Sequence, residues 1–206
     1  RRPLCRLHPR WLGRLERNEP GTVGSDLSVA DDSEQVHLLV GGRSLARTDP
    51  DREALDVVDH VLGGGLSSRL FDEIRERRGL AYSIYSGSAS YVDTGAWSVY
   101  AGTLPEHAAE VTELLHTELE RLASGGITDD ELDVAVGYLT GSYELGLEDS
   151  GARMSRLGAL LTTVGEVRPV EAQLARWRAV DHEAVRRVVE RVYAVAPVTV
   201  ALGPLG

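Results

Sequence analysis

The sequence predicts an α+β fold in which an antiparallel or mixed sheet has its helices packed on one face. Short apolar or alternating runs, which are typical of strands, occur at residues 33–42, 81–91, 95–102 and 198–202. Over residues 105–193, apolar side chains recur every three or four positions, which indicates consecutive amphipathic helices. The expected order of elements is β-α-α-β-β-α-α-α-α-α-β. A hairpin and a late return strand favour antiparallel pairing.

Length and composition limit the class of protein. The chain has 206 residues, enough for one sizeable core, and its 42% hydrophobic and 26% charged residues are ordinary for a globular domain. Its net charge of −10 argues against nucleic acid and anionic membrane surfaces as partners. The single cysteine, Cys5, allows no internal disulfide and indicates a reducing compartment, so the expected location is the cytoplasm.

The N-terminal segment, residues 1–27, is interpreted as a connector, and residues 28–206 as the folded domain. Pro3, Pro9 and Pro20 prevent a long helix in the connector. A linker or tail without further function is the alternative interpretation of this segment.

Two helices separated by glycines are expected between the first strand and the hairpin. The first helix covers residues 51–62 and ends at the glycines of positions 63–65, because glycine adopts positive φ without strain. Ser67 or Ser68 then caps a second helix, which stops at Gly79. The three glycines are not a nucleotide-binding loop, because the sequence has no lysine to complete that motif.

The hairpin of residues 81–91 and 95–102 is expected at the centre of the sheet. Strand alternation places Tyr82 and Ile84 on the same face of the first strand. Arg75 lies in the last turns of the preceding helix, and Tyr82 follows directly after the turn. The two side chains are therefore expected to project toward the same space.

The second half of the domain is predicted to be helical before the chain returns as a strand. Thr128 and Glu131 form a capping box at the start of the helix that follows. Glycines within that helix, at Gly137, Gly141 and Gly146, are expected to allow close contact with another helix. The expected helices cover residues 105–124, 129–148, 151–164, 169–177 and 181–193.

One run of the sequence resembles a known family. Gly-Gly-Gly-Leu-Ser-Ser-Arg-Leu-Phe-Asp-Glu-Ile-Arg-Glu-Arg-Arg-Gly-Leu-Ala-Tyr-Ser, at residues 63–83, looks like the second-half signature of the pitrilysin/insulinase-type zinc metallopeptidases, in the processing-peptidase branch. Tyr-Val-Asp-Thr-Gly at residues 91–95 continues the resemblance, which covers about residues 28–206.

The resemblance implies the C-terminal half of an enzyme built from two homologous halves. In that family the first half binds zinc through His-x-x-Glu-His and a distant Glu, and the second supplies an Arg and a Tyr seven residues apart to the substrate carbonyl. Arg75 and Tyr82 have this spacing, whereas His-x-x-Glu-His is absent. The implied function is hydrolysis of peptides enclosed between the halves, with Arg75 and Tyr82 binding the scissile carbonyl and stabilising the oxyanion.

The resemblance also implies the partners. Zinc would be held by the other half, and this chain alone would be inactive. Residues 1–27 would be the end of a connector from a missing N-terminal half, and a homo-oligomer is possible. A peptide substrate could also contact the glycine loop, which the resemblance places facing the peptide chamber. The loop residues are Gly63, Gly64 and Gly65.

Two other functions fit the same residues. The chain could be a non-catalytic subunit of a processing-peptidase-like complex that binds peptides or supports a catalytic partner. It could also be an unrelated α+β binding domain, if the resemblance over residues 61–102 were accidental. Because Arg75 and Tyr82 match the Arg and Tyr of the resembling family, the peptidase half is favoured over these two alternatives.

Possible metal ligands in the chain form no complete site. Asp56-x-x-Asp59-His60 has the spacing of a zinc-peptidase helix, with Asp56 where the first His would stand. No third ligand can be named, so a solvated helix face is the simpler interpretation. His107-x-x-Glu110 lacks its second histidine. We therefore expect no metal ligands in this chain.

Overall fold

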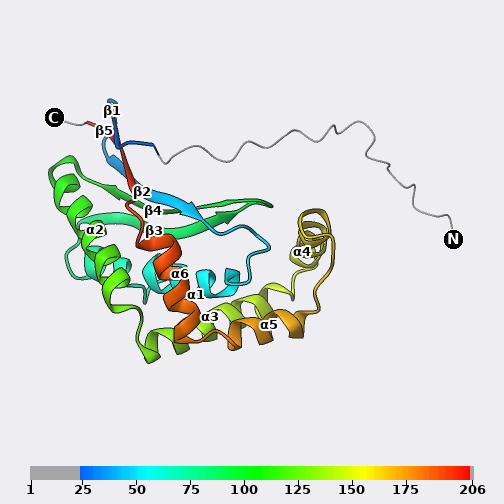
Figure 1. Ribbon diagram of the computed structural model, residues 1–206. Coiled ribbons are helices and arrows are strands. Elements are labelled where there is room, and N and C mark those ends of the chain that lie inside the picture. The colour runs from blue at the N-terminus through cyan, green and yellow to red at the C-terminus, as the bar shows by residue number, and fades with distance from the viewer. Residues whose placement is uncertain (1–23, 205–206) are drawn as a thin grey trace.

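The structure is a computed structural model that describes residues 24–204 (Figure 1). Within this range a single sheet contains the strands β1 (Leu27–Ala30), β2 (Val36–Ser44), β3 (Ala81–Ser90), β4 (Gly95–Thr103) and β5 (Val198–Gly203). The helices are α1 (Arg52–Gly63), α2 (Ala108–Gly125), α3 (Asp129–Gly146), α4 (Ser150–Thr163), α5 (Val170–Arg178) and α6 (His182–Val188). Two π-helical segments, Phe71–Glu76 and Val189–Tyr193, and a 3-10 turn, Pro105–His107, complete the described part. The predicted α+β class is confirmed.

The sheet is mixed, in the order β1-β5-β2-β4-β3. Strand β1 pairs with β5 in parallel, and every other pair is antiparallel. The predicted order of elements lacked β1, whose four residues are all exposed and give no apolar pattern. The predicted connector, residues 1–27, lies outside the described residues except for its last four.

The predicted hairpin is confirmed, but its position in the sheet was wrong. Strand β3 pairs with β4 alone and forms an edge of the sheet, so only β4 is internal. The pairing of β3 shifts register between Ala81 and Ser83, which makes Tyr82 the extra residue of a β-bulge. Ile84 is therefore buried, whereas Tyr82 is 76% exposed, and the predicted shared face of these two side chains does not form.

The helices cover one face of the sheet, as predicted, and leave the other face open (Figure 1). Along β2, Leu38 and Val40 are buried, while Leu39 between them is exposed. Tyr85 on β3 is exposed on the open face and stacks with Tyr100 of β4, with ring centroids 5.0 Å apart. None of the helices in residues 24–204 is long and apolar enough to cross a lipid bilayer.

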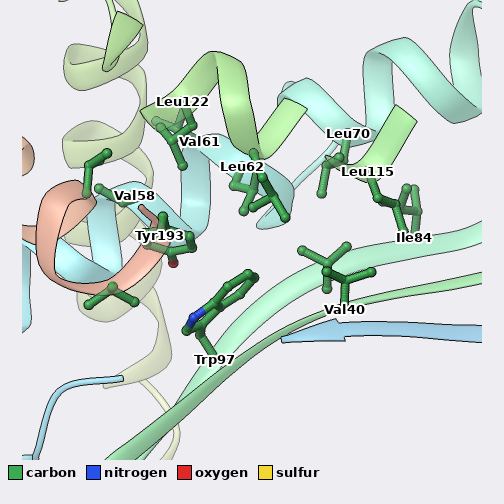
Figure 2. Close-up of a cluster of buried hydrophobic side chains, with 14 of the residues drawn as sticks. Val40, Val58, Val61, Leu62, Leu70, Ile84, Trp97, Leu115, Leu122 and Tyr193 are labelled. Atoms are coloured by element: carbon green, nitrogen blue, oxygen red, sulfur yellow. The ribbon is translucent and has the colours of Figure 1, made fainter. Parts of the chain in front are cut away.

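The core lies between the sheet and the helices (Figure 2). Val40 and Trp97 extend from the strands, and Leu62 of α1 and Leu115 of α2 meet them from the helices. The ring of Tyr193 packs against Trp97 at a centroid distance of 4.8 Å. This packing fixes α1, and with it the loop that leads into the π-helical segment.

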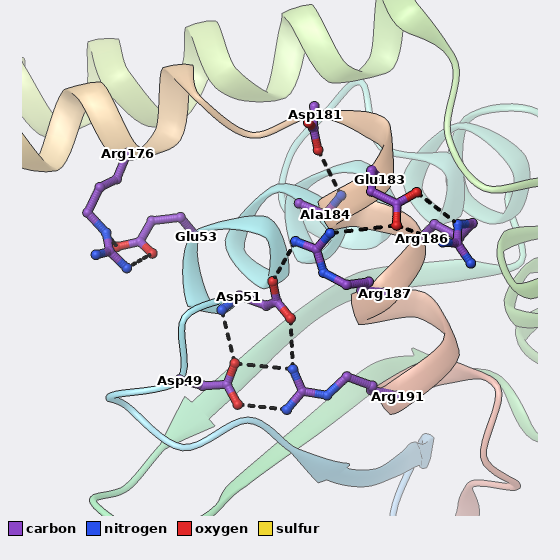
Figure 3. Close-up of polar contacts among 10 residues, drawn as sticks. All are labelled: Asp49, Asp51, Glu53, Arg176, Asp181, Glu183, Ala184, Arg186, Arg187 and Arg191. Atoms are coloured by element: carbon purple, nitrogen blue, oxygen red, sulfur yellow. Dashed lines mark hydrogen bonds and ion pairs between the residues drawn. The ribbon is translucent and has the colours of Figure 1, made fainter.

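Ion pairs hold the C-terminal helices against the start of α1 (Figure 3). Arg191 binds Asp49 at 2.7 Å, and Arg187 binds Asp51 at 3.0 Å. Arg176 of α5 binds the buried carboxylate of Glu53 at 2.6 Å. Burial alone would raise the pKa of Glu53, but hydrogen bonding and charge from Arg176 lower it below its ordinary value.

Candidate functional site

Arg75 and Tyr82 are brought together by the turn between the π-helical segment Phe71–Glu76 and β3. Gly79 ends the helical segment with φ of 65°, a left-handed conformation that glycine adopts without strain. The amide of Leu80 then donates to the carbonyl of Ile74 at 2.9 Å, which folds the chain back onto its own helix. Single π-helical turns and β-bulges are both frequent at functional sites, and here one follows the other.

The guanidinium of Arg75 is held by two aromatic rings. Its central carbon lies 4.8 Å from the ring centroid of Phe71 and 5.5 Å from that of Tyr82. Both distances are within the range of a cation–π contact. The predicted approach of Arg75 and Tyr82 is thus present in the geometry.

Arg75 differs from the arginines beside it. Arg77 pairs with Asp72 at 2.8 Å, and Arg78 pairs with Glu73 at 2.8 Å. Arg75 makes no hydrogen bond and no ion pair with any residue of the described range 24–204. Its five N–H donors are therefore free to bind an oxygen of a ligand.

A hollow of about 320 Å³ lies beside these two side chains. Gln35, Leu104 and His107 belong to its lining, together with Arg75 and Tyr82. Carbonyl oxygens in this hollow could accept hydrogen bonds from a guanidinium and from a phenol, which is a donor set suited to an oxyanion.

The structural role of the glycine loop differs from the prediction. None of its three glycines has positive φ. Instead, a Cβ on Gly63 would lie 2.5 Å from the amide nitrogen of Ser86, and a Cβ on Gly64 would lie 2.5 Å from Cα of His60. Close packing against β3 explains Gly63, whereas Gly64 is packed against His60 of the preceding helical turn. The predicted cap of the next helix by Ser67 or Ser68 also fails, because the buried Ser68 hydroxyl has no hydrogen-bond partner and the π-helical segment Phe71–Glu76 has no side-chain cap.

Asp56, Asp59 and His60 do not form a metal site. The Tyr193 hydroxyl donates to Oδ1 of Asp59 at 2.5 Å, and the Trp177 indole donates to Oδ2 of Asp56 at 3.1 Å. The ring of His60 stacks instead on Tyr138. Within residues 24–204, no group of three or more His, Cys, Asp or Glu side chains could hold a metal ion. Asp56, Asp59 and His60 therefore do not fit zinc.

Sequence reasoning missed the residues that support Arg75. Phe71 is four positions before Arg75, a spacing that places two helical side chains together, so the pair could have been predicted from the sequence. Gln35 and His107 reach the hollow from the bend before β2 and from the turn before α2, which no local pattern connects to Arg75.

Comparisons with known proteins agree with this fold. Residues 9–139 match the family described as peptidase M16 inactive domain. The chain is 46% identical to an uncharacterized zinc protease of Streptomyces coelicolor, over 84% of this chain and 38% of that protein. It is 30% identical to the uncharacterized zinc protease YmxG of Bacillus subtilis, over 96% of this chain and 50% of that protein.

Solved structures show the same fold. A peptidase M16 inactive domain from Pseudomonas fluorescens superposes with a TM-score of 0.82 and 26% identity, covering 92% of this chain and 45% of that one. A chain of complex III2 from Candida albicans superposes with a TM-score of 0.77 at 18% identity, covering 88% and 46%. The chain thus spans half or less of the length of these relatives.

Proposed function

We propose that this chain, which belongs to the family of peptidase M16 inactive domains, is the half of a zinc endopeptidase that supplies Arg75 and Tyr82 to the scissile carbonyl. Substrates are peptides or unfolded segments enclosed between this half and a zinc-binding half. The names of the relatives as zinc proteases support the enzyme class.

The unpaired guanidinium of Arg75 is the observation that carries the proposal. The sequence has 32 acidic and 22 basic residues. Carboxylates therefore outnumber basic side chains, and an exposed arginine is expected to form an ion pair. Arg77 and Arg78 both have one, whereas Arg75 contacts two rings and leaves its donors unused among the described residues. An arginine positioned by aromatic contacts and left without an acceptor is suited to a ligand.

In this function the two donors act on the same oxygen. Arg75 stays charged at every working pH, and the Tyr82 hydroxyl adds a neutral donor from the neighbouring strand. Negative charge develops on the carbonyl oxygen as the peptide is attacked, so both hydrogen bonds strengthen in the transition state. Removal of one such donor typically lowers turnover by about 10²–10³-fold.

The remaining parts of the enzyme belong to the other half. Zinc is proposed to bind there, because no group of side chains in the described residues 24–204 fits a metal. The length of the relatives, at least twice the matched part, supports the existence of a second half. We also propose a cytoplasmic location, which the single cysteine supports.

The test is steady-state peptidase kinetics of the full-length protein that contains this chain and its zinc-binding half. Arg75→Ala should lower kcat/KM by about 10²–10³-fold, and Tyr82→Phe should do the same while keeping the ring that contacts Arg75. Arg77→Ala is the matched control, because Arg77 is exposed nearby but paired with Asp72. Unchanged kcat/KM in both site variants would refute the proposed roles. No activity in the zinc-loaded protein would favour a non-catalytic subunit.

A further inference from the structure

A second hollow lies where the end of α1 and the loop that follows it meet α3. It is smaller than the first, about 140 Å³, and is lined by His60, Val61, Ser67, Asp130, Glu131 and Val134. The proposed carbonyl-binding role of Arg75 and Tyr82 uses none of these residues.

The ring of His60, which lines this hollow, packs closely against Gly65 of the loop. A Cβ on Gly65 would lie 3.2 Å from Cε1 of His60, so a side chain there would displace the ring. The imidazole is also stacked on Tyr138, with ring centroids 4.2 Å apart and 18° between planes. Burial lowers the pKa of His60, so the ring that lines the hollow is neutral.

Exposed apolar side chains lie on the elements that form the hollow. Val134, which lines it, is 51% exposed, and Tyr138, which stacks on the lining residue His60, is 52% exposed. Leu66, next to the lining residue Ser67 in the chain, is 78% exposed. Apolar groups with this exposure are typical of a surface that binds a partner or a ligand. Glu131 is already paired with Arg69 at 2.6 Å and bonded to the Thr128 amide, so it adds no free charge.

The face of α3 that carries Val134 and Tyr138 also carries two glycines. Residues 134, 137, 138 and 141 fall on one stripe of a helix. A Cβ on Gly137, Gly141 or Gly146 would meet nothing within 4 Å among the described residues, so the close helix contact predicted for these glycines is not made within residues 24–204. Gly137 and Gly141 weaken the helix relative to alanine, and each leaves bare backbone beside the hollow.

We infer that this hollow is a binding site for one apolar side chain, of about the size of leucine or methionine, of a peptide whose backbone lies along the bare face of α3. The inference rests on the proposed function in one respect, namely that the chain handles peptides. The volume fits a single side chain, and Val61, Val134 and the ring of His60 give the hollow walls that suit an apolar one, although the exposed carboxylate of Asp130 also lines it. Such a pocket would select peptides at a position away from the scissile bond.

The experiment combines a cleavage profile with a binding measurement on the full-length protein. Val134→Trp fills the hollow, and Val195→Trp is the matched control, because Val195 is 55% exposed and does not line the hollow. An unfolded protein is digested, and the cleavage sites are mapped by mass spectrometry. Val134→Trp should lose a preference for leucine or methionine at one fixed position by about 10- to 200-fold, and Val195→Trp should keep it.

The binding measurement does not depend on activity. The methyl resonances of Val61 are followed by NMR while N-acetyl-leucine amide is added, with N-acetyl-alanine amide as the control ligand. The leucine amide should shift these resonances in the wild type and not in Val134→Trp. If the Val61 methyl resonances shift in a protein that has no peptidase activity, the inferred binding site is supported and the proposed function is refuted.

Two results would overturn the inference. The first is an unaltered cleavage profile in Val134→Trp together with no shift of the Val61 methyl resonances. The second is dissociation of the two halves of the protein in Val134→Trp but not in Val195→Trp, because the occupant would then be a side chain of the other half.

Discussion

Asp59 gives the protein a dependence of stability on pH that one substitution should remove. The carboxyl lies between α1 and β3, where it accepts a hydrogen bond from the Tyr193 hydroxyl. The pKa of Asp59 is raised from 3.8 to about 6, mainly by burial and also by the charge of Asp56, while the hydrogen bond from Tyr193 opposes the rise. The difference from the ordinary value corresponds to about 3 kcal/mol between the two protonation states.

The direction in which the free energy of unfolding changes with pH depends on whether the folded or the unfolded state holds the proton. Between about pH 4 and pH 6, the folded state keeps a proton on Asp59 that the unfolded chain has released. The free energy of unfolding therefore falls as pH rises through this window and stays lower above it. Asp59→Asn cannot ionise, and its carbonyl can still accept the bond from Tyr193. The variant should gain about 3 kcal/mol relative to the wild type between pH 4 and pH 7.

The assay is urea unfolding followed by tryptophan fluorescence at half-unit steps from pH 4 to pH 7.5. The measured quantity is the difference between the two proteins, because carboxylates with lowered pKa values, such as Glu53, change both curves equally. Asp72→Asn is the control, since that carboxylate is exposed and paired with Arg77. A difference between wild type and Asp59→Asn that stays constant over this range would refute the reasoning.

Two further outcomes are expected. Gly79→Ala should destabilise the protein by about 1–2 kcal/mol, because φ at this position is 65°, and the midpoint of urea unfolding measures the change. Gly125→Ala, in α2 with open space around its Cβ position, is the control that should not destabilise; equal effects of both substitutions would contradict the argument. This chain alone, dialysed against zinc and then against buffer, should retain far less than one equivalent by mass spectrometry, because Asp56, Asp59 and His60 face different partners. Stoichiometric zinc that resists a chelator would show that a site exists.

The sequence predicted the elements whose patterns are local. The capping box of Thr128 and Glu131 forms as expected, with the Thr128 amide donating to Glu131 at 2.8 Å. Arg75 and Tyr82 approach each other because a short helix, one left-handed glycine and a strand follow directly in the chain. In these cases a few neighbouring residues determine the conformation.

The errors concern features that depend on distant residues. Strand β1 exists because β5, at the far end of the described chain, pairs with it, and its own residues give no signal. The edge position of β3 depends on the order of the whole sheet. The bulge at Tyr82 and the tight packing of Gly63 on Ser86 are set by which surfaces meet, which residue periodicity does not report.

The parallel pairing of β1 with β5 determines how the domain responds to a pulling force. The two strands pair from Leu27 with Val200 to Ala30 with Gly203, and they run in the same direction. A force that draws the start of β1 away from the end of β5 therefore acts along the strands, so that these bonds must break together and not one after another. The amide of Asp31, which donates to the carbonyl of Gly203 at 2.9 Å, extends the same ladder. Strand β1, which has no apolar pattern in the sequence, is thus expected to resist a force that pulls β1 and β5 in opposite directions.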